Sequence, residues 1–543
     1  MIFLQLCIAS MYPSSRFLPR EKIKVGYSKL VESQLIQKFN NLILILIKKD
    51  QDSKNPVNLQ PNILDISIDK IHQFHRQWKS TVFLGNTNFL VALSLSTAYG
   101  KQLIFPLTRE WAEEIAKSGV KINKFLSQIL FNFYLLSKCL ISIYKSLVFL
   151  YHSIHKNQDN FQNHSPQYNM VYIPNLQQGH FSGDFEYNFI GWLKKKEFPN
   201  SDLIVIHSNP QIKREELEHE NISLQFVNFS WRWDSGIVKD FTFRLILVVK
   251  CLLYFLSHKN KRLVLLHLNE ILLAQYTYST SPKNNIRYLL FDQSHGSLVP
   301  LWASILNRRE NRNILFFNAT AAEPQLESGA EFKPNLWANA SWEEIWVIDI
   351  VQRIKLQSVV LKSEIRFKEI GVPGWVDTHA FIPKVSAAIA LFDSEPQKNL
   401  YYLSPNISLG MYTQEFYEQF FHNILEKAKY YNFTIFHKVK KSTNKHAEPF
   451  YNKIRNELTF KFNNVYQTIN PNIAPKKLLE SSIACICQPI STTGLIARSL
   501  NLPTMYYDPL NKINPNDQSL RGIPIIYSTE LETWFDNLRR SLK

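Results

Sequence analysis

Cysteine is scarce in this chain, which has five among 543 residues. All five lie in apolar segments, with neither the paired spacing of a zinc site nor a pattern that suggests a disulfide framework. Cys485 and Cys487 fall inside a predicted buried strand, which favours inert thiols over a redox pair. The shortage excludes a disulfide-stapled secreted domain and indicates a reducing compartment, which we take to be the cytoplasm.

The signatures of several common enzyme classes are also missing. The chain contains no G-x-x-x-x-G-K-[ST] loop, no G-x-G-x-x-G fingerprint and no H-E-x-x-H pair. Nothing in the sequence therefore suggests a P-loop kinase, a nicotinamide-dependent dehydrogenase or a zinc hydrolase. We predict no metal ligands and no separate cofactor.

Acidic residues are absent from 115 to 158, although this segment is strongly apolar. A spanning helix needs about 20 apolar residues with few charges, and lysines interrupt this run. On a helix they would form one slowly drifting stripe, because they are spaced by multiples of seven: Lys117, Lys124, Lys138 and Lys145. Such a helix, at about 116–155, is typical of one lying in the interface of an anionic membrane. The alternative is a core helix with snorkelling lysines.

The net charge of +17 favours an anionic partner, such as a membrane surface, nucleic acid or phosphorylated substrates. Nucleic-acid binding would group basic and aromatic residues on one face, whereas here they are dispersed, so no nucleic acid is expected. The first ten residues are apolar but lack a basic segment, and we expect no signal peptide.

The length predicts several domains, and the pattern of apolar runs divides the chain into an N-terminal extension (1–165) and two α/β domains (166–380 and 381–543). In each domain, short apolar runs alternate with helical segments, as in parallel sheets. We therefore predict an α/β fold in which two doubly wound, Rossmann-like sheets face one another across a cleft. Strands are expected at 170–173, 202–207, 224–229, 262–266, 287–291, 313–317 and 344–349, and then at 387–392, 433–441, 464–469, 483–487, 504–507 and 523–527.

Ligands of open parallel sheets sit outside the carboxyl ends of the strands. In the first domain, the glycine-containing loop 178–184 offers His180 or Asp184 as a general base. Asp292, which follows a later strand, is the other candidate. Each could instead be an ordinary loop residue or a helix cap.

In the second domain, Ser491, Thr492 and Thr493 stand between a buried strand and a helix. A helix start carries free N–H groups and partial positive charge, so these residues are candidates for binding phosphates. A plain N-cap is the alternative. Lys438 and Lys440 lie on one face of another strand end and would complement a diphosphate there, unless they are merely solvated.

Two segments carry a family resemblance. Pro489-Ile-Ser-Thr-Thr-Gly-Leu-Ile-Ala497, followed by Leu502-Pro-Thr-Met-Tyr-Tyr-Asp-Pro509, resembles the bacterial polysaccharide biosynthesis PFTS-motif proteins. The segments around Phe291–Trp302, Ile345 and Lys438 are also similar, and the likeness covers roughly residues 170–540. More distantly, the C-terminal pattern is similar to GT-B glycosyltransferases, although Ile496 stands where many of them have a ribose-binding Glu.

The resemblance implies a metal-independent GT-B-like glycosyltransferase of surface polysaccharide or lipopolysaccharide assembly. It would transfer a sugar from a nucleotide-activated donor, held by the second domain, to a glycan or lipid-linked acceptor on the first. The enzyme would be peripheral on the inner face of the cytoplasmic membrane. Two alternatives remain: a nucleotide-sugar epimerase of the same fold, and a non-catalytic polysaccharide-assembly protein.

Overall fold

The structure, a computed structural model, describes residues 87–151 and most of 169–542, together with 22–23, 25–26, 29–30, 71, 74–75 and 78. Within 169–542 the description leaves out 174–175, 177–179, 181–184, 208–221, 227–241, 243, 252, 254–260, 281–285, 294–295, 297, 307–311, 321–325, 328–329, 332–336, 339, 375–379, 397–408 and 440–447. The candidates Asp184 and Lys440 thus lie outside the described residues.

The first domain is built on a seven-stranded sheet with the order β3-β2-β1-β4-β5-β8-β9, in which every strand pair is parallel. The strands are β1 (Asn169–Tyr172), β2 (Leu203–His207), β3 (Ile222–Phe226), β4 (Ile286–Asp292), β5 (Arg312–Phe316), β8 (Glu344–Val347) and β9 (Arg366–Glu369). The helices of this domain include α8 (Phe189–Glu197), α12 (Leu301–Leu306) and α13 (Ile350–Gln357), and β6 (Leu326–Glu327) pairs with β7 (Ala330–Glu331) in a separate hairpin.

The second domain is built on a six-stranded parallel sheet with the order β12-β11-β10-β13-β14-β15. Its strands are β10 (Ala388–Phe392), β11 (Thr434–Lys438), β12 (Tyr466–Ile469), β13 (Ala484–Cys487), β14 (Thr504–Tyr507) and β15 (Ile525–Ile526). Its helices are α14 (Gln414–Tyr431), α15 (Pro449–Lys461), α16 (Pro475–Glu480), α17 (Thr492–Ser499) and α18 (Leu531–Ser541), with the 3₁₀ turns η8 (Leu409–Tyr412) and η9 (Gln518–Leu520).

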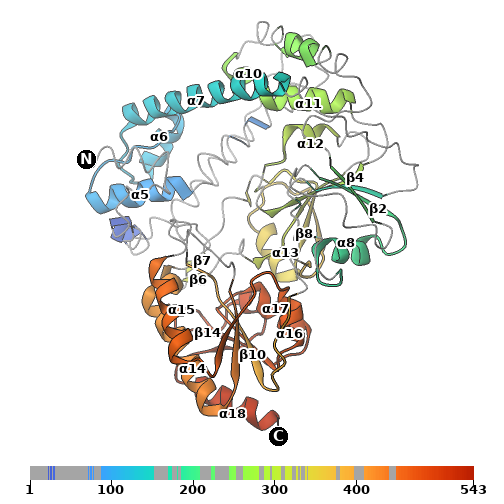
Figure 1. Cartoon of the computed structure of the whole chain (residues 1–543). Coiled ribbons are helices and arrows are strands. Elements are labelled where there is room, and N and C mark those ends of the chain that lie inside the picture. Colours follow the sequence, from blue (N-terminus) through green and yellow to red (C-terminus); the bar gives the residue numbers. More distant parts are fainter. Residues whose placement is uncertain are drawn as a thin grey trace.

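Burial explains why the central strands were readable from the sequence. β10 and β13 are buried along their whole length, so both faces of each strand carry apolar residues. In each sheet the strand order reverses once, between β1 and β4 in the first and between β10 and β13 in the second. Two doubly wound parallel sheets confirm the predicted α/β fold, and Figure 1 shows one domain above the other.

Among the described N-terminal residues, helices with complete bounds include α5 (Thr87–Tyr99), α6 (Arg109–Lys117) and α7 (Lys124–Tyr151). The helix predicted at about 116–155 therefore begins at Lys124, and Lys117 belongs to α6 instead, because the turn at 118–123 separates the two helices. α7 packs against α10 (Lys261–Leu266) and α11 (Leu268–Thr280), and all three lie at the end of the molecule away from the second sheet (Figure 1). The strand predicted at 262–266 is wrong, since this run forms α10. Periodicity alone cannot tell whether a short apolar run is a strand or a helix. Here the run packs against the helices α7 and α11 and takes no part in the sheet.

Candidate functional site

Two candidates from the first domain lie at the point where its strand order reverses. His180 is in the loop after β1, and Asp292 is the last residue of the neighbouring strand β4. His180 is 4% exposed, and its ring centroid lies 5.7 Å from that of Phe189 in α8. Burial lowers the pKa of His180 to about 4, while the Asp292 carboxylate acts in the opposite direction. The site therefore holds a neutral imidazole next to a carboxylate that would stabilise its protonated form.

In the second domain the strand order reverses between β10 and β13, and the motif segment 489–497 follows β13. Ser491 is the N-cap of α17, and its Oγ accepts a hydrogen bond from the Thr493 N–H at 3.3 Å. The two hydroxyl oxygens of Ser491 and Thr493 are 2.6 Å apart, and Thr493 Oγ1 is also 3.3 Å from Cys487 Sγ. The capping role of Ser491 is thus present. All three candidate side chains are half-buried rather than enclosed.

Tyr506 fixes this turn from the next strand. Its hydroxyl donates to the Ser491 carbonyl at 2.9 Å, and its ring lies against Gly494. A Cβ atom on Gly494 would come within 2.8 Å of the Tyr506 ring and hydroxyl. Gly494 of the Thr-Thr-Gly segment therefore leaves the space that the Tyr506 ring of the Tyr-Tyr segment fills.

We expect Gly494→Ala to lower the free energy of unfolding by about 1–3 kcal/mol, the range for overpacking a filled interior. The displaced ring would also loosen the start of α17. Urea unfolding followed by tryptophan fluorescence measures the change, with Ser499→Ala on the exposed end of the same helix as control. Equal midpoints for the two variants would contradict this explanation.

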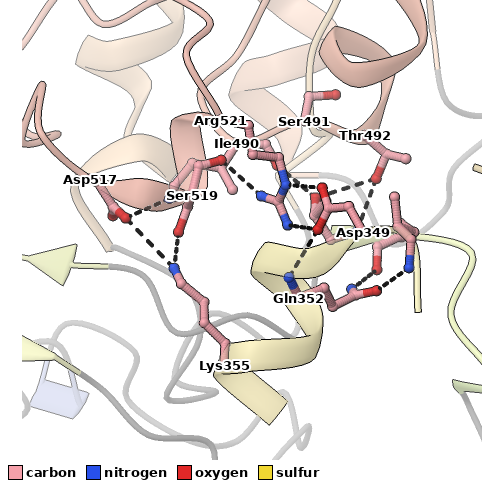
Figure 2. Close-up of polar contacts among 12 residues, drawn as sticks. Asp349, Gln352, Lys355, Ile490, Ser491, Thr492, Asp517, Ser519 and Arg521 are labelled. Atoms are coloured by element: carbon pink, nitrogen blue, oxygen red, sulfur yellow. Dashed lines mark hydrogen bonds and ion pairs between the residues drawn. The ribbon is translucent and has the colours of Figure 1, made fainter. Parts of the chain in front are cut away.

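Ile490 has an uncommon backbone conformation for a β-branched residue, with a φ of +62°. Such a conformation costs about 1–3 kcal/mol and persists only where surrounding contacts hold it. One of these contacts comes from the first domain, because Thr320 Oγ1 donates to the Ile490 carbonyl at 2.8 Å. Figure 2 shows Ile490 beside Ser491 and Thr492 at the boundary between the domains.

Thr320 brings the two sheets together at their carboxyl edges. It follows β5, and its backbone N–H donates to Thr492 Oγ1 at 3.0 Å. Since Thr492 starts α17 directly after β13, the loop after β5 meets the loop after β13. The predicted phosphate-binding turn therefore faces the first domain, and its Thr492 hydroxyl is bonded to that domain in this structure.

A second interdomain contact is ionic (Figure 2). Asp349 is the N-cap of α13, because its Oδ1 accepts a hydrogen bond from the Gln352 N–H at 2.9 Å. The same carboxylate accepts hydrogen bonds from Nε and Nη2 of Arg521, the latter at 3.1 Å. Nearby, Lys355 Nζ donates to Ser519 and lies 3.6 Å from Asp517 Oδ1. Arg521 is 5% exposed and its partner Asp349 is 27% exposed, so the Arg521–Asp349 pair is partly shielded from solvent, and the Lys355–Asp517 pair is nearly buried.

Lys438 is not brought to the Ser491 turn. Its Nζ donates to the Pro471 carbonyl at 2.9 Å, in the loop after β12. β11, which carries Lys438, is separated from β13 by β10, and two strand spacings amount to roughly 10 Å. A role of Lys438 in binding phosphate at α17 stays a prediction.

Two residues beside the second reversal point were missed from the sequence. Asp393 directly follows β10, and its side chain is fully buried. One carboxylate oxygen lies 3.1 Å from His437 Nε2, and the other accepts from the Tyr451 hydroxyl at 2.6 Å. Burial and the Asp393 charge raise the pKa of Tyr451 well above its usual value. Gln488 links the loops after β10 and β13, because its Oε1 accepts from the Ser394 N–H at 2.7 Å. The only sequence signal for Asp393 was a carboxylate at the end of a buried strand.

Asp508, the acidic residue of the Tyr-Tyr-Asp-Pro segment, has a structural role. Its carboxylate is fully buried and accepts from the backbone N–H groups of Leu510, Lys512 and Ile513 at 3.2, 2.5 and 2.8 Å. It thereby holds the turn that leaves β14. Among the residues that the structure describes, no group of three or more His, Cys, Asp or Glu side chains could hold a metal ion.

Comparisons with solved structures find similar chains at low identity. One is a UDP-glucosyltransferase from Polygonum tinctorium (11% identity, 70% of this chain and 94% of that chain, TM-score 0.34). Others are the wall teichoic acid polymerase TagF (11%, 75% and 89%, TM-score 0.38) and the UDP-GlcNAc 2-epimerase from Methanocaldococcus jannaschii (13%, 68% and 91%, TM-score 0.35). The fold assignment above depends on strand order rather than on these likenesses.

No curated protein matches the sequence. The family model for polysaccharide biosynthesis PFTS motif proteins matches residues 248–535, more than half of the chain. The matched region includes Asp292, the Thr320 contact and the whole second sheet. The chain therefore belongs to the polysaccharide biosynthesis PFTS motif protein family.

Proposed function

We propose that this protein is a glycosyltransferase that moves a sugar from a nucleotide-activated donor to a glycan or lipid-linked acceptor during surface polysaccharide assembly. One observation carries the proposal: the carboxyl edges of the two sheets meet, because the Thr320–Thr492 hydrogen bond joins the loop after β5 to the start of α17. His180 and Asp292 lie at the reversal point of the first sheet, and Ser491 and Thr493 lie beside that of the second. Open parallel sheets bind ligands at such points.

The reaction divides between the two edges. A neutral His180 accepts the proton of the acceptor hydroxyl as it attacks the anomeric carbon, and the Asp292 carboxylate stabilises the imidazolium that forms. On the other side, the C1–phosphate bond breaks and the leaving phosphate takes up negative charge beside the backbone N–H groups and partial positive charge at the start of α17. In this proposal the helix start, with the Ser491 and Thr493 hydroxyls, takes the role that a metal ion has in other transferases.

Binding of the sugar donor changes the contacts of Thr492. Its Oγ1 accepts from the Thr320 N–H at 3.0 Å and lies 3.3 Å from Thr320 Oγ1, whose own proton goes to the Ile490 carbonyl. The Thr492 hydroxyl can therefore turn its proton from Thr320 Oγ1 to a phosphate oxygen while it keeps the bond from the Thr320 N–H. This exchange would couple donor binding to the interdomain contact.

A thermal-shift screen tests the proposal. Purified protein is heated with CMP-, UDP-, GDP- and dTDP-sugars, and we expect one nucleotide class to raise the midpoint of unfolding. Thr492→Val keeps the shape of the side chain and removes the hydroxyl, and Ser491→Ala removes the cap; both should reduce the shift. Lys438→Ala tests the remaining predicted phosphate ligand.

Ser499→Ala, at the far end of α17, is the matched control and should respond like the native protein. Absence of a shift with every nucleotide would contradict the proposal and favour a non-catalytic assembly role. Conversion of the bound sugar to its epimer without an acceptor would favour an epimerase instead.

We further propose that the enzyme acts in the cytoplasm. Cys251, Cys485 and Cys487 are buried thiols, and burial raises the pKa of Cys251 to about 12. Cys485 and Cys487 lie 3.3 Å apart, sulfur to sulfur, as thiols. Such a set fits a reducing compartment, where nucleotide-sugars are available.

A further inference from the structure

α7 presents a continuous apolar stripe to solvent. Six large side chains on it are each between 47% and 74% exposed: Phe125, Ile129, Phe133, Leu136, Leu140 and Leu147. At 100° per residue these positions fall within an arc of about 80°, and over 22 residues the stripe is about 33 Å long. Solitary exposed apolar residues are ordinary, but a contiguous patch of this size marks an interaction surface.

The opposite side of α7 attaches the helix to the first domain. Ser127, Ser142 and Ser146 are buried there, and Ser142 Oγ accepts from the Asn269 N–H of α11 at 3.0 Å. Lys145 is on this side too, where its charge interacts with Glu270 of α11. The lysines therefore do not form the exposed stripe, and the contact with a partner must begin with apolar side chains.

A second segment adds to this end of the domain. Residues 244–251 are helical, and Arg244 stacks its guanidinium 4.5 Å from the Tyr276 ring centroid of α11. The other side of this segment exposes Leu245, Ile246 and Val249. Both apolar surfaces are thus anchored to the same helix, α11.

We infer that this surface, formed by α7 and residues 244–251, lies on a phospholipid bilayer that contains anionic lipids. The six stripe positions are all aliphatic or aromatic, and the window Lys124–Val148 is predominantly apolar, as in a helix that lies in the acyl boundary of a bilayer. Anionic lipids would meet no like charge along α7, because residues 115–158 contain no acidic residue, and the whole chain carries +17, although the lysines of α7 lie on its other side.

α7 lies in the plane of the interface rather than across the membrane. Its window from Lys124 to Val148 is long and apolar enough to span, and 11% of it is buried. Its bond to α11 and the buried serine side, however, keep it against a domain that also holds half of the candidate site. A spanning helix would have to lose these contacts.

Flotation of the full chain with liposomes tests this inference. Vesicles of phosphatidylcholine with phosphatidylglycerol should carry the native protein, and vesicles of phosphatidylcholine alone should carry less. The triple variant Phe133→Ser/Leu136→Ser/Leu140→Ser should reduce the partition coefficient at least tenfold, because the apolar side chains that enter the interface are gone.

The matched control replaces three exposed aromatic residues elsewhere, Phe381→Ser/Tyr430→Ser/Phe460→Ser, and should bind vesicles like the native protein. Unfolding midpoints of both triple variants, measured without lipid, establish that they fold. Donor binding in the thermal-shift screen should be the same in both, so a failure here is separate from a failure of the proposed activity.

Three outcomes would overturn the inference. Equal flotation of the two triple variants would mean that the stripe does not bind lipid. A lipid-free dimer that the stripe variant alone converts to a monomer, without flotation of the native protein, would assign the surface to a second copy of the chain. Resistance of membrane-bound native protein to alkaline carbonate extraction would show that α7 spans the bilayer.

Discussion

Replacing His180 with Gln should reduce the rate of sugar transfer by about 10²–10⁴-fold, the usual contribution of a positioned general base. Gln keeps a polar side chain of similar size but cannot accept the proton of the acceptor hydroxyl. The midpoint shift caused by the nucleotide-sugar should persist, because His180 lies in the first domain and the phosphates are bound by the second. A transfer assay at saturating donor measures the loss, with His422→Gln in α14 as control.

The pH dependence of stability gives an independent check on His180. Its pKa is about 4 in the folded protein, against 6.5 for an ordinary histidine. Above pH 6.5 the imidazole is neutral in both states and contributes nothing. Between pH 6.5 and 4 the unfolded chain binds a proton that the folded chain does not, so the free energy of unfolding falls by about 3 kcal/mol as the pH decreases.

His180→Gln should remove the loss of unfolding free energy that His180 causes between pH 6.5 and 4. A similar loss should remain in this variant, because burial lowers the pKa of His267 to about 3. Urea unfolding at several pH values between 4 and 7 measures both. A variant with full transfer activity would refute the assignment of His180 as base. An unchanged pH slope would mean that His180 is not buried in its neutral form.

The interdomain ion pair should have a large effect on stability. Arg521→Ala leaves the Asp349 carboxylate without its bidentate partner, and because this carboxylate is 27% exposed we expect a cost near the lower end of the about 3–5 kcal/mol that breaking a buried pair costs. Asp349→Asn is the informative second variant. Asn is as good an N-cap for α13 as Asp, so this change removes the charge and keeps the cap.

A double-mutant cycle separates the two contributions. We expect Arg521→Ala/Asp349→Asn to cost less than the sum of the two single changes, because the double variant contains no unpaired charge. The measurement is urea unfolding with separate probes for the two domains, since they need not unfold together. The surface pair Lys427–Glu532 is the control and should contribute no more than about 1 kcal/mol. Additive costs would contradict a direct coupling between Asp349 and Arg521.

The parts of the fold that the sequence predicted are those where burial imposes a simple pattern. β10 and β13 are apolar on both faces, and Pro489 and Pro503 mark ends that the structure reproduces within a few residues. The run at 262–266 has the same composition, yet it forms α10, because its partner is α7 rather than a neighbouring strand. Composition identified a buried segment there but not the element that buries it.

The sequence predicted individual candidate residues, but it did not predict the contacts between the two domains that surround them. Loop positions after strands located His180, Asp292 and Ser491, because parallel sheets place those loops on one edge. Thr320 and Arg521 could not be found in this way. Their roles come from the approach of two domains, and a threonine or arginine in a loop carries no sequence signal for its partner 172 positions away.

The most direct test of the account is a structure of the protein with the nucleotide-sugar that stabilises it. We expect the phosphates within hydrogen-bonding distance of the backbone N–H groups at Ser491–Thr493, between the edges that carry His180 and Thr320, with the Thr492 hydroxyl donating to a phosphate oxygen. A nucleotide bound elsewhere, for example in the hollow lined by Pro515, Leu520 and Ile525, would contradict it.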